Sequence, residues 1–346
     1  MANISDVANR ANVSAMTVSR VTNNSGYVKA ETRERVLRAM QELNYHPNYL
    51  ARSLVEQRTH MMALIVPDIT NPFYTSVARG AEDMARARGY RLILCNSDES
   101  LDKEQEYVNM CLSIRVDGLV IVSAGDESRT HLAKFQTYAI PVVLLDREVP
   151  GIEADLVTGD NVYGSSRLVE HLIAQGHRRI AMVGGGRSIS TSRERLAGYR
   201  LALEEAGIAF DEDLVYETSY ARSPKPAIVD ALLAEANRPT AVFAGNNFVA
   251  TGIILELRRR RLQVPEDIAI VCFDDIDPLS LAEPFLTVAM QPAYEEGRLA
   301  TQLLLERIES DPSSATLNPR KIVMKPELLF RRSSGAPGEW KPTVVE

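Results

Sequence analysis

The stretch "ISDVANRANVSAMTVSRVTNN", Ile4 to Asn24, predicts the fold of the first part of the chain. Its apolar residues recur three and four positions apart, which is the spacing of helices that bury one face. The break "ANV" divides it into two helices, with Ser5 as a possible N-cap of the first and Ser14 as N-cap of the second. A third helix over about residues 30–43 follows the turn "NNSG". Two short helices braced by a third are typical of a helix-turn-helix domain.

The second helix has one face that the core does not need. Val18 and Val21 point inward, which leaves Ala15, Met16 and Arg20 on the outward face. A helix of this kind enters the DNA major groove, where arginine matches the O6 and N7 acceptors of guanine. Ala15 and Met16 offer only apolar contact, for example to thymine methyl groups. The alternative is that Met16 belongs to the core and Arg20 is a solvated charge.

Charge is distributed unevenly along the chain. The 346 residues have a formal net charge of −7, but residues 1–58 hold eight lysines and arginines against five acidic residues, a net +3. The remaining residues therefore sum to −10. This asymmetry favours a small basic head that meets phosphates and a large acidic body that does not.

From Met61 onward, short apolar runs alternate with longer amphipathic stretches. The runs are "MALIVPD", "RLILCNS", "GLVIVS" and "PVVLLD", then, after "GDNVYG", "RIAMVGG", "TAVFAG" and "IAIVCFDD". Nearly continuous hydrophobic strands alternating with helices are typical of parallel sheets covered on both faces. Two such series predict two doubly wound α/β subdomains, with a ligand cleft at the carboxyl ends of their strands.

Other function classes find little support in the sequence. No apolar run approaches the roughly 18 residues of a membrane span, and the N-terminus has no apolar signal core, so we expect a cytoplasmic protein. Cys95, Cys111 and Cys272 lack metal-type spacing and are expected to be reduced core thiols. The glycine-rich "VGGGR", residues 183–187, lacks the features of a P-loop or a dinucleotide fingerprint. We therefore expect no catalytic residues, no metal site and no cofactor.

Six segments together resemble the lactose/galactose-repressor (LacI/GalR) family. They are "ISDVANRANVSAMTVSRVTNN", "TRERVLRAMQELNYHPNYLARSL", "HLIAQGHRRIAMVGG", "RLAGYRLALEEAGI", "RPTAVFAGNN" and "VPEDIAIVCFDDI". The resemblance runs from about Ile4 to Arg332. It implies a homodimeric bacterial transcription regulator, expected to be a repressor. Its body would be similar to periplasmic sugar-binding proteins, with a small molecule in the cleft controlling its affinity for operator DNA.

The patterns and the resemblance together predict a division of the chain. The helix-turn-helix DNA-binding domain covers residues 1–46, a hinge helix and linker 47–60, and the ligand-binding and dimerisation domain 61–332. One subdomain of that domain takes about 61–160 plus 292–321, and the other about 161–291 plus 322–332. Residues 333–346 mix glycine, proline and polar groups and are expected to form a disordered tail.

For the DNA-binding parts, the resemblance implies specific contacts with a pseudo-palindromic operator. Ala15 and Met16 match its specificity positions, and Arg20 matches its base-reading position. The expected contacts to the DNA backbone come from Ser5, Thr17, Ser19 and Asn23. Paired hinge helices would enter the minor groove, with Leu54 wedged into a central pyrimidine–purine step and Arg52 beside the phosphates. The alternative for Leu54 is packing against the body.

Strand ends and family positions together predict the effector-binding residues. The strand ends give Asn71, Phe73, Tyr74, Arg147 and Asp160. The resemblance adds Arg195, Tyr220, Asn246 and Asp274, and the positions beside these or beside a crossover strand add Thr191, Arg193 and Gln291. Structural alternatives stay open for three of them: Asp160 and Asp274 as helix or loop caps, and Phe73 as a core residue.

One departure from the family bears on the effector. The family often has Asn-Asp where this chain has Asn246–Asn247. The loss of that acid, together with Arg147, Arg193 and Arg195, slightly favours a sugar acid or sugar phosphate over a neutral sugar. A purine-type co-repressor is an alternative within the same fold. A transport-type solute-binding protein, or an α/β enzyme with a DNA-binding head, is less favoured.

Overall fold

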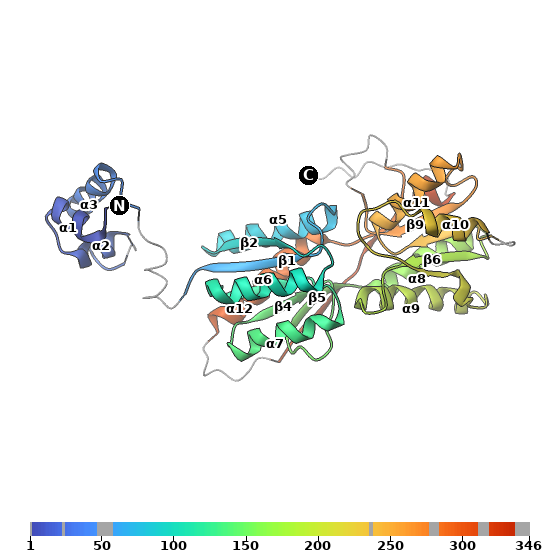
Figure 1. Cartoon of the computed structure of the whole chain (residues 1–346), viewed down its shortest axis with the longest axis horizontal. Helices are drawn as coiled ribbons and strands as arrows, with labels where there is room; N and C mark the ends of the chain where they lie inside the picture. Colours follow the sequence, from blue (N-terminus) through green and yellow to red (C-terminus); the bar gives the residue numbers. More distant parts are fainter. Residues whose placement is uncertain are drawn as a thin grey trace. The chain divides into compact units, whose positions relative to one another are not determined.

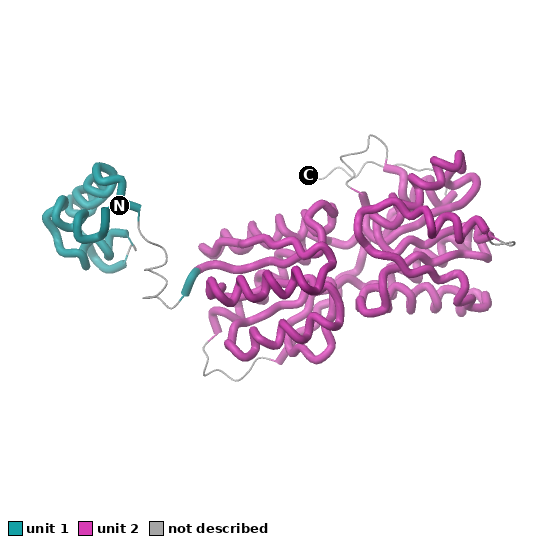
Figure 2. The backbone as a smooth tube through the Cα atoms, in the orientation of Figure 1, with its two compact units in different colours: residues 1–59 teal, residues 60–346 magenta. Residues whose placement is uncertain are grey.

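The computed structural model describes residues 2–22, 25–46, 58–234, 238–276, 284–310 and 318–335. The chain forms two compact units, Met1–Thr59 and His60–Glu346, drawn in teal and magenta in Figure 2. We call them the head and the body. Each has a hydrophobic core of its own. Within the described ranges, no helix combines the length and the apolar character that crossing a membrane requires.

The head is a bundle of three short helices (Figure 1). They are α1 (Ile4–Ala11), α2 (Ala15–Thr22) and α3 (Ala30–Glu42), close to the expected ranges. One apolar cluster joins all three, with buried members Val7, Ala8, Ala11, Val18, Val21, Val36 and Ala39. An ion pair of 2.5 Å between Arg10 and Glu42 also links α1 to α3. The helix-turn-helix prediction is confirmed.

The first two helices begin at different kinds of cap. The Asn3 side chain accepts hydrogen bonds from the backbone N–H groups of Ser5 and Asp6, and the Asp6 carboxylate accepts from the Asn3 N–H at 2.8 Å. The expectation of Ser5 as N-cap is therefore wrong, because Asn3 forms a reciprocal capping box with Asp6. At the start of α2, Ser14 Oγ accepts from the Thr17 N–H at 3.2 Å, as expected.

The body contains two six-stranded sheets. The first has the order β11-β5-β4-β3-β1-β2 and is parallel throughout. The second has the order β12-β10-β9-β8-β6-β7 and is parallel except for the edge strand β12. The strands of the first sheet are β1 (Met61–Val66), β2 (Arg91–Asn96), β3 (Gly118–Ile121), β4 (Val142–Leu145), β5 (Asp155–Gly159) and β11 (Lys321–Met324). Those of the second are β6 (Ile180–Gly184), β7 (Val215–Glu217), β8 (Ala241–Ala244), β9 (Ala269–Phe273), β10 (Thr287–Met290) and β12 (Glu327–Leu329).

Helices cover both faces of each sheet, which explains why the strands are nearly continuous apolar runs. On the first sheet, α5 and α12 pack on one face and α6 and α7 on the other. On the second sheet, α8 and α9 oppose α10 and α11. The helices are α5 (Pro72–Ala87), α6 (Leu101–Ile114), α7 (Arg129–Thr137), α8 (Asn161–Ala174), α9 (Ser190–Glu205), α10 (Pro226–Ala234), α11 (Asn247–Arg259) and α12 (Ala293–Glu309), with short turns η1 (Asp126–Ser128), η2 (Glu212–Leu214) and η4 (Arg332–Ser334).

Two glycines let α5 and α12 approach each other closely. A Cβ on Gly80 would lie 2.0 Å from the carbonyl oxygen of Tyr294, and a Cβ on Gly297 would lie 2.1 Å from that of Val77. Any side chain at either position would force the helices apart. This pair joins α12, late in the sequence, to the first helix of the body.

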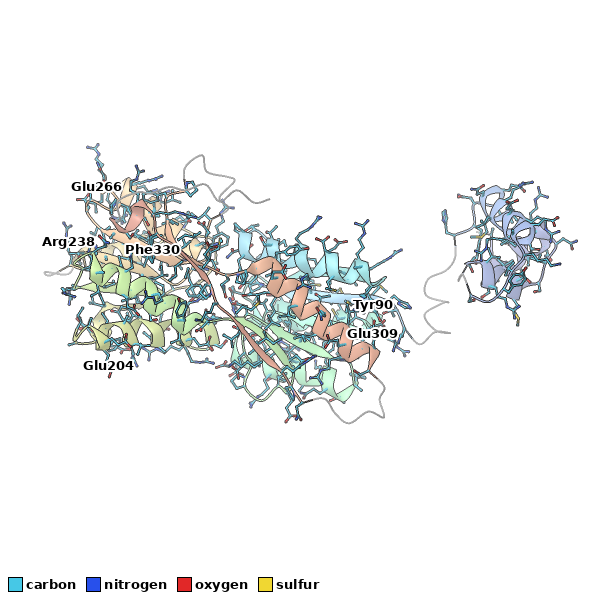
Figure 3. The ribbon with its side chains drawn as sticks, turned by 180° about the vertical axis from the view of Figure 1, so that it is seen from behind. Tyr90, Glu204, Arg238, Glu266, Glu309 and Phe330 are labelled. Carbon is cyan, nitrogen blue, oxygen red and sulfur yellow. The ribbon has the colours of Figure 1, made fainter. Side chains whose placement is uncertain are left out.

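Three segments cross between the sheets, at residues 159–161, 290–293 and 325–326. Figure 3 shows the last segment reaching Phe330 beside the second sheet. The expected return to the second subdomain at residue 322 is wrong, because β11 (Lys321–Met324) pairs along its whole length with β5 of the first sheet. The strand shifts that boundary to residues 325–326.

The expected disorder from residue 333 is also wrong for its first residues. Ser333 and Ser334 are fully buried. Ser333 Oγ accepts from the Thr287 N–H at 2.8 Å and donates to the Ile270 carbonyl at 2.6 Å, so it joins β10 to β9. Residues 336–346 lie outside the described part.

Cys95, Cys111 and Cys272 are buried free thiols, as expected.

Candidate functional site

The outward face of α2 carries the side chains predicted to read DNA bases. Ala15, Met16 and Arg20 are exposed, and Met16 keeps 66% of its surface accessible. Val18 and Val21 are buried beneath them. The alternative of Met16 as a core residue is therefore excluded. The helix presents two apolar side chains, one of them the large Met16, and one arginine to solvent.

Three of the predicted DNA-backbone residues lie in the described part of the head. Ser5 is exposed in the first turn of α1, while Thr17 and Ser19 are half-buried on α2. The hydroxyls of Thr17 and Ser14 share a hydrogen bond of 2.9 Å. Three further predicted residues, Asn23, Arg52 and Leu54, lie outside the described residues. Their roles stay predictions.

A small cavity of about 80 Å³ lies in the body, where the carboxyl ends of the strands of both sheets meet. Nine of the twelve predicted effector residues line it. They are Asn71, Phe73, Tyr74, Arg147, Thr191, Arg195, Tyr220, Asn246 and Asp274. The other lining residues are Asp68, Asp98, Glu99, Asp146, Ala221 and Phe248. The ends of strands in parallel sheets are where ligands are expected to bind.

The remaining three predicted residues do not line the cavity. Asp160 is the N-cap of α8, accepting from the Tyr163 N–H at 3.0 Å, so its structural alternative holds. Arg193 forms a two-bond ion pair with Asp126, at 2.8 and 3.2 Å. Gln291 is buried behind the cavity and donates to both carboxylate oxygens of Asp274, at 3.0 and 3.2 Å.

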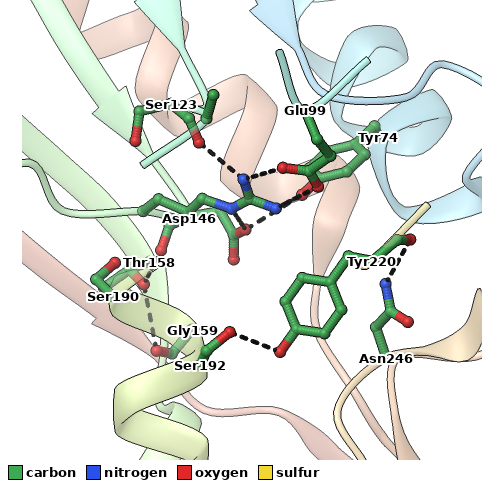
Figure 4. A network of polar contacts seen from close by, with 12 residues as sticks. Tyr74, Glu99, Ser123, Asp146, Thr158, Gly159, Ser190, Ser192, Tyr220 and Asn246 are labelled. Atoms are coloured by element: carbon green, nitrogen blue, oxygen red, sulfur yellow. Dashed lines mark hydrogen bonds and ion pairs between the residues drawn. The ribbon is translucent and has the colours of Figure 1, made fainter. Parts of the chain in front are cut away.

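Both Nη atoms of Arg147 are occupied by protein groups, among them Glu99 and Ser123, which are labelled in Figure 4. Its two Nη atoms donate to the carboxylate of Glu99 at 2.7 and 2.8 Å, and one also donates to the Ser123 carbonyl at 2.8 Å. Glu99 lies 48 residues earlier in the chain, in the turn that follows β2. The sequence reasoning missed Glu99, although it follows a strand end as Arg147 does.

Arg195 is held from three sides. Its Nε donates to Asn161 Oδ1 at 2.8 Å, one Nη donates to the Gly245 carbonyl at 2.5 Å, and its guanidinium stacks 3.9 Å from the centre of the Phe273 ring. The other Nη has no hydrogen-bond partner in the part of the body that the structure describes. A fixed guanidinium with donor capacity left over lies on the cavity wall.

Burial raises the pKa values of three carboxyl groups at this site. Asp146 is raised against the opposing effect of Arg195, and Asp274 is raised to about 6. Glu296 on α12 is raised well above its ordinary value by burial and by the charge of Asp146. Both Glu296 oxygens lack a hydrogen-bond partner among the described residues. With a pKa of about 6, Asp274 is mostly ionised at pH 7, and the raised pKa of Glu296 favours its neutral form.

Four cavity residues have left-handed backbone. They are Asp98 (φ 54°), Glu99 (φ 58°), Asp146 (φ 61°) and Asp274 (φ 63°), and each follows a strand end. Non-glycine residues adopt this region at an energetic cost, and such residues cluster at functional sites. The geometry places their carboxyl groups on the cavity wall, where the sequence reasoning had named only Asp274.

Contacts across the cleft hold the two halves of the body together. The amides of Asn71 and Asn247 donate to each other, at 3.1 and 3.0 Å. The ion pair of Asp126 with Arg193 is a second contact across the cleft. A third is the hydrogen bond that the Glu148 N–H donates to Ser190 Oγ at 2.9 Å. Asn247 is thus a structural contact between the halves. The acid missing at this position says little about the charge of the ligand.

The reciprocal amide pair makes Asn247→Asp a test of the closed arrangement. Aspartate cannot donate, so the variant keeps the bond that it accepts from Asn71 and loses the two bonds that Asn247 donates, to Asn71 Oδ1 and to the Asp275 carbonyl. It also places a carboxylate beside these two carbonyl oxygens. We expect a loss of about 1–3 kcal/mol in the free energy of unfolding, measured in urea. Asn71→Asp is the matched control. It keeps the acceptor that caps α5 and should cost less, so equal losses would contradict this role.

The comparisons with known proteins agree over both units. Residues 3–48 match the model for bacterial regulatory proteins of the lacI family, and residues 59–325 match that for periplasmic binding proteins and the sugar binding domain of the LacI family. A ribose operon repressor of Bacillus subtilis (strain 168) is 38% identical over 316 residues, 91% of this chain and 94% of the relative. The PurR transcriptional repressor of Vibrio campbellii (strain ATCC BAA-1116) is 35% identical over 335 residues, 96% and 98% of the two chains.

A solved structure shows the same architecture. The lac repressor dimer bound to operator and the anti-inducer ONPF has a TM-score of 0.82 at 26% identity, covering 96% of this chain and 99% of that chain. The named relatives are DNA-binding repressors. The chain has a helix-turn-helix head and a body with a cavity where its two sheets meet. It therefore belongs to the LacI family of bacterial transcription regulators, as a DNA-binding regulator that responds to a small ligand.

Proposed function

We propose that the protein represses transcription as a homodimer on a pseudo-palindromic operator, and that a neutral monosaccharide in the cavity controls its affinity for that operator. The observation that carries the ligand class is the charge of the cavity wall. Five acidic residues (Asp68, Asp98, Glu99, Asp146 and Asp274) line it with only two arginines, Arg147 and Arg195. An anionic ligand would meet a wall of its own sign.

The arginines that favoured an acidic ligand in the sequence have other partners. Arg147 is paired with Glu99, and Arg193 is paired with Asp126 away from the cavity wall. In the described part of the site, Arg147 keeps only its buried Nε–H without a hydrogen-bond partner, 3.8 Å from the Asp146 carboxylate, and Arg195 keeps one Nη for a ligand. We therefore propose a neutral sugar in place of a sugar acid or sugar phosphate.

The unused hydrogen-bonding groups fit a ligand with several hydroxyls. Asp146 Oδ1 is a buried acceptor of a cavity-lining residue that lacks a partner among the described residues. Carboxylates accept hydrogen bonds from neighbouring hydroxyls, Arg195 can donate, and the rings of Phe73 and Tyr220 supply apolar walls. The small cavity favours a single sugar ring. The relatives include a repressor named for ribose and one named PurR, so a purine is the competing ligand.

The DNA half of the proposal rests on the exposed face of α2. Ala15, Met16 and Arg20 would read base edges, with Ser5, Thr17, Ser19 and Asn23 on the DNA backbone. Arg52 and Leu54 of the hinge would enter the minor groove. In this proposal the protein works on the nucleoid in the cytoplasm, without a cofactor and without turning over its ligand.

A ligand screen tests this proposal. Thermal unfolding is followed with D-ribose, other neutral monosaccharides, ribose 5-phosphate, gluconate and adenine, because a ligand of the native state raises the melting temperature. Hits are then added to a complex with an operator selected from random duplexes, followed by fluorescence anisotropy. We expect a neutral monosaccharide to stabilise the protein and change its operator affinity. Responses confined to the phosphate, the acid or the purine would overturn the ligand class.

A further inference from the structure

Lys225 is a buried lysine close to the cavity that no expected role of the chain requires. It is only 5% exposed and lies directly before α10. Its Nζ donates to the carbonyls of Ser219 and Ala221, at 2.9 and 3.3 Å, and to Ser223 Oγ at 2.9 Å. In the described part of the body, no carboxylate pairs with it. A buried ammonium is costly unless its donors are satisfied, and here three acceptors of one loop satisfy them.

The loop that Lys225 holds carries Tyr220 into the cavity. The two bonded carbonyls belong to the residues on either side of Tyr220, and Ala221 also lines the cavity. The Tyr220 hydroxyl accepts from Ser192 Oγ at 3.0 Å, and its carbonyl accepts from the Asn246 side chain at 3.4 Å (Figure 4). Residues 218–225 form no helix or strand, so side-chain bonds replace regular backbone pairing.

The surroundings of Lys225 are shaped to receive it. Pro224 and Pro226 flank it, which restricts the backbone and leaves no neighbouring N–H to bond the loop. On α11, Gly252 leaves room for the lysine stem, because a Cβ there would lie 2.8 Å from Lys225 Cγ and 2.6 Å from the Ser223 carbonyl oxygen. Two elements thus accommodate one side chain.

We propose that Lys225 is a positioning residue of the effector site, whose ammonium group fixes residues 219–223 so that the Tyr220 ring is set in the cavity before the ligand arrives. This inference rests on the proposed function of the cavity. A cavity whose Tyr220 ring is already in place binds its ligand more tightly, because less of the loop must be ordered on binding. Burial lowers the pKa of Lys225, because a buried ammonium group loses its hydration. Deprotonation at alkaline pH turns the ammonium into an amine, which has two N–H donors in place of three.

Two measurements on Lys225→Met test the proposal. Methionine keeps the apolar stem and removes all three donors. Hydrogen exchange of residues 218–223 in the ligand-free protein is expected to be at least tenfold faster in the variant, with α8 and α9 unchanged. Affinity for D-ribose by calorimetry is expected to fall at least tenfold, with operator affinity unchanged without ligand. As the pH is raised from 7 towards 10.5, the ordinary pKa of lysine, the wild-type affinity for D-ribose should decline, and that of the variant should not.

Two further variants complete the test. Gly252→Ala should displace the lysine stem and accelerate exchange in the same loop, whereas Lys134→Met, on the distant helix α7, should change nothing. Unchanged exchange in both Lys225→Met and Gly252→Ala would overturn the role of Lys225. If wild-type protein does not bind D-ribose or another neutral sugar, the proposed ligand is wrong, and hydrogen exchange still decides whether Lys225 fixes the loop.

Discussion

Replacing Arg195 with alanine is expected to lower effector affinity by at least roughly thirtyfold and to remove the effector's influence on operator binding. The side chain is 3% exposed and makes two hydrogen bonds and a ring stack inside the body. Its remaining N–H groups face a site otherwise rich in acceptors. Alanine removes the donor for the ligand and also leaves Asn161 Oδ1 and the Gly245 carbonyl without their partner, so both the ligand contact and its support are lost.

The same change should alter the acids around the cavity. Arg195 lowers the pKa values of Asp146, Asp274 and Glu296, each of which burial raises. Without its charge, the pKa of Asp274 should rise above its present value of about 6, so that more of this group is neutral at pH 7. Any ligand affinity that survives in Arg195→Ala should therefore increase as the pH is raised from 6 to 8.

Calorimetry with the ligand found by the screen measures the loss, and anisotropy on the selected operator measures the response. Arg193→Ala is the matched control, because it removes the same charge two residues away on α9, where the side chain pairs with Asp126. It should change effector affinity less than about threefold, as expected of a partly exposed ion pair. A variant at Arg195 that binds and responds like the wild type would refute the assignment of this site.

The contrast between Arg193 and Arg195 shows how far the sequence could predict the site. Both lie in the first turns of α9, and only the direction of each side chain separates a rim ion pair from a cavity wall. Family positions pointed to Arg195, which lines the cavity, but no local pattern could exclude Arg193, which does not. Its partner Asp126 is 67 residues earlier in the chain, so their pairing depends on how the two halves meet.

Strand ends were the most reliable signal, and they were applied unevenly. The strand that ends before Asp146–Arg147 was recognised, but the equivalent Asp98–Glu99 after β2 was not, although the same rule covers both. The two sheets themselves could be predicted, because strands buried on both faces are continuous apolar runs. The short edge strand β12 could not, since half-exposed residues such as Leu328 leave no comparable run.

The cleft contacts suggest how the effector site and operator binding are coupled. The amide pair of Asn71 and Asn247 and the ion pair of Asp126 and Arg193 close the cavity from both halves of the body. A ligand that favours this closed arrangement shifts the body toward it only as far as it binds that arrangement better. If the closed body binds operator less well, the operator complex must bind the ligand less well by the same factor.

At the other end of the chain, Arg20→Ala should weaken binding to the selected operator by about 1–3 kcal/mol for each half-site. Arg20 is the one exposed side chain of α2 able to make a bidentate contact with guanine, since Ala15 and Met16 lack donors. Its stem lies beside Gly26, where a Cβ would be 3.7 Å from Arg20 Cδ. Because a dimer reads two half-sites, the loss should appear twice, and base preference should relax at one symmetrical pair of positions.

Selection of binding sites from random duplexes measures that preference directly. Arg20→Lys separates charge from geometry, because lysine keeps the positive charge without the planar fork that fits O6 and N7 of guanine. We expect it to retain the salt dependence of wild-type binding and to lose most of the base preference. Arg38→Ala, at an exposed arginine of α3 for which no base contact is expected, should leave the selected motif unchanged. An Arg20→Ala protein that selects the wild-type motif would show that α2 reads its operator without this arginine.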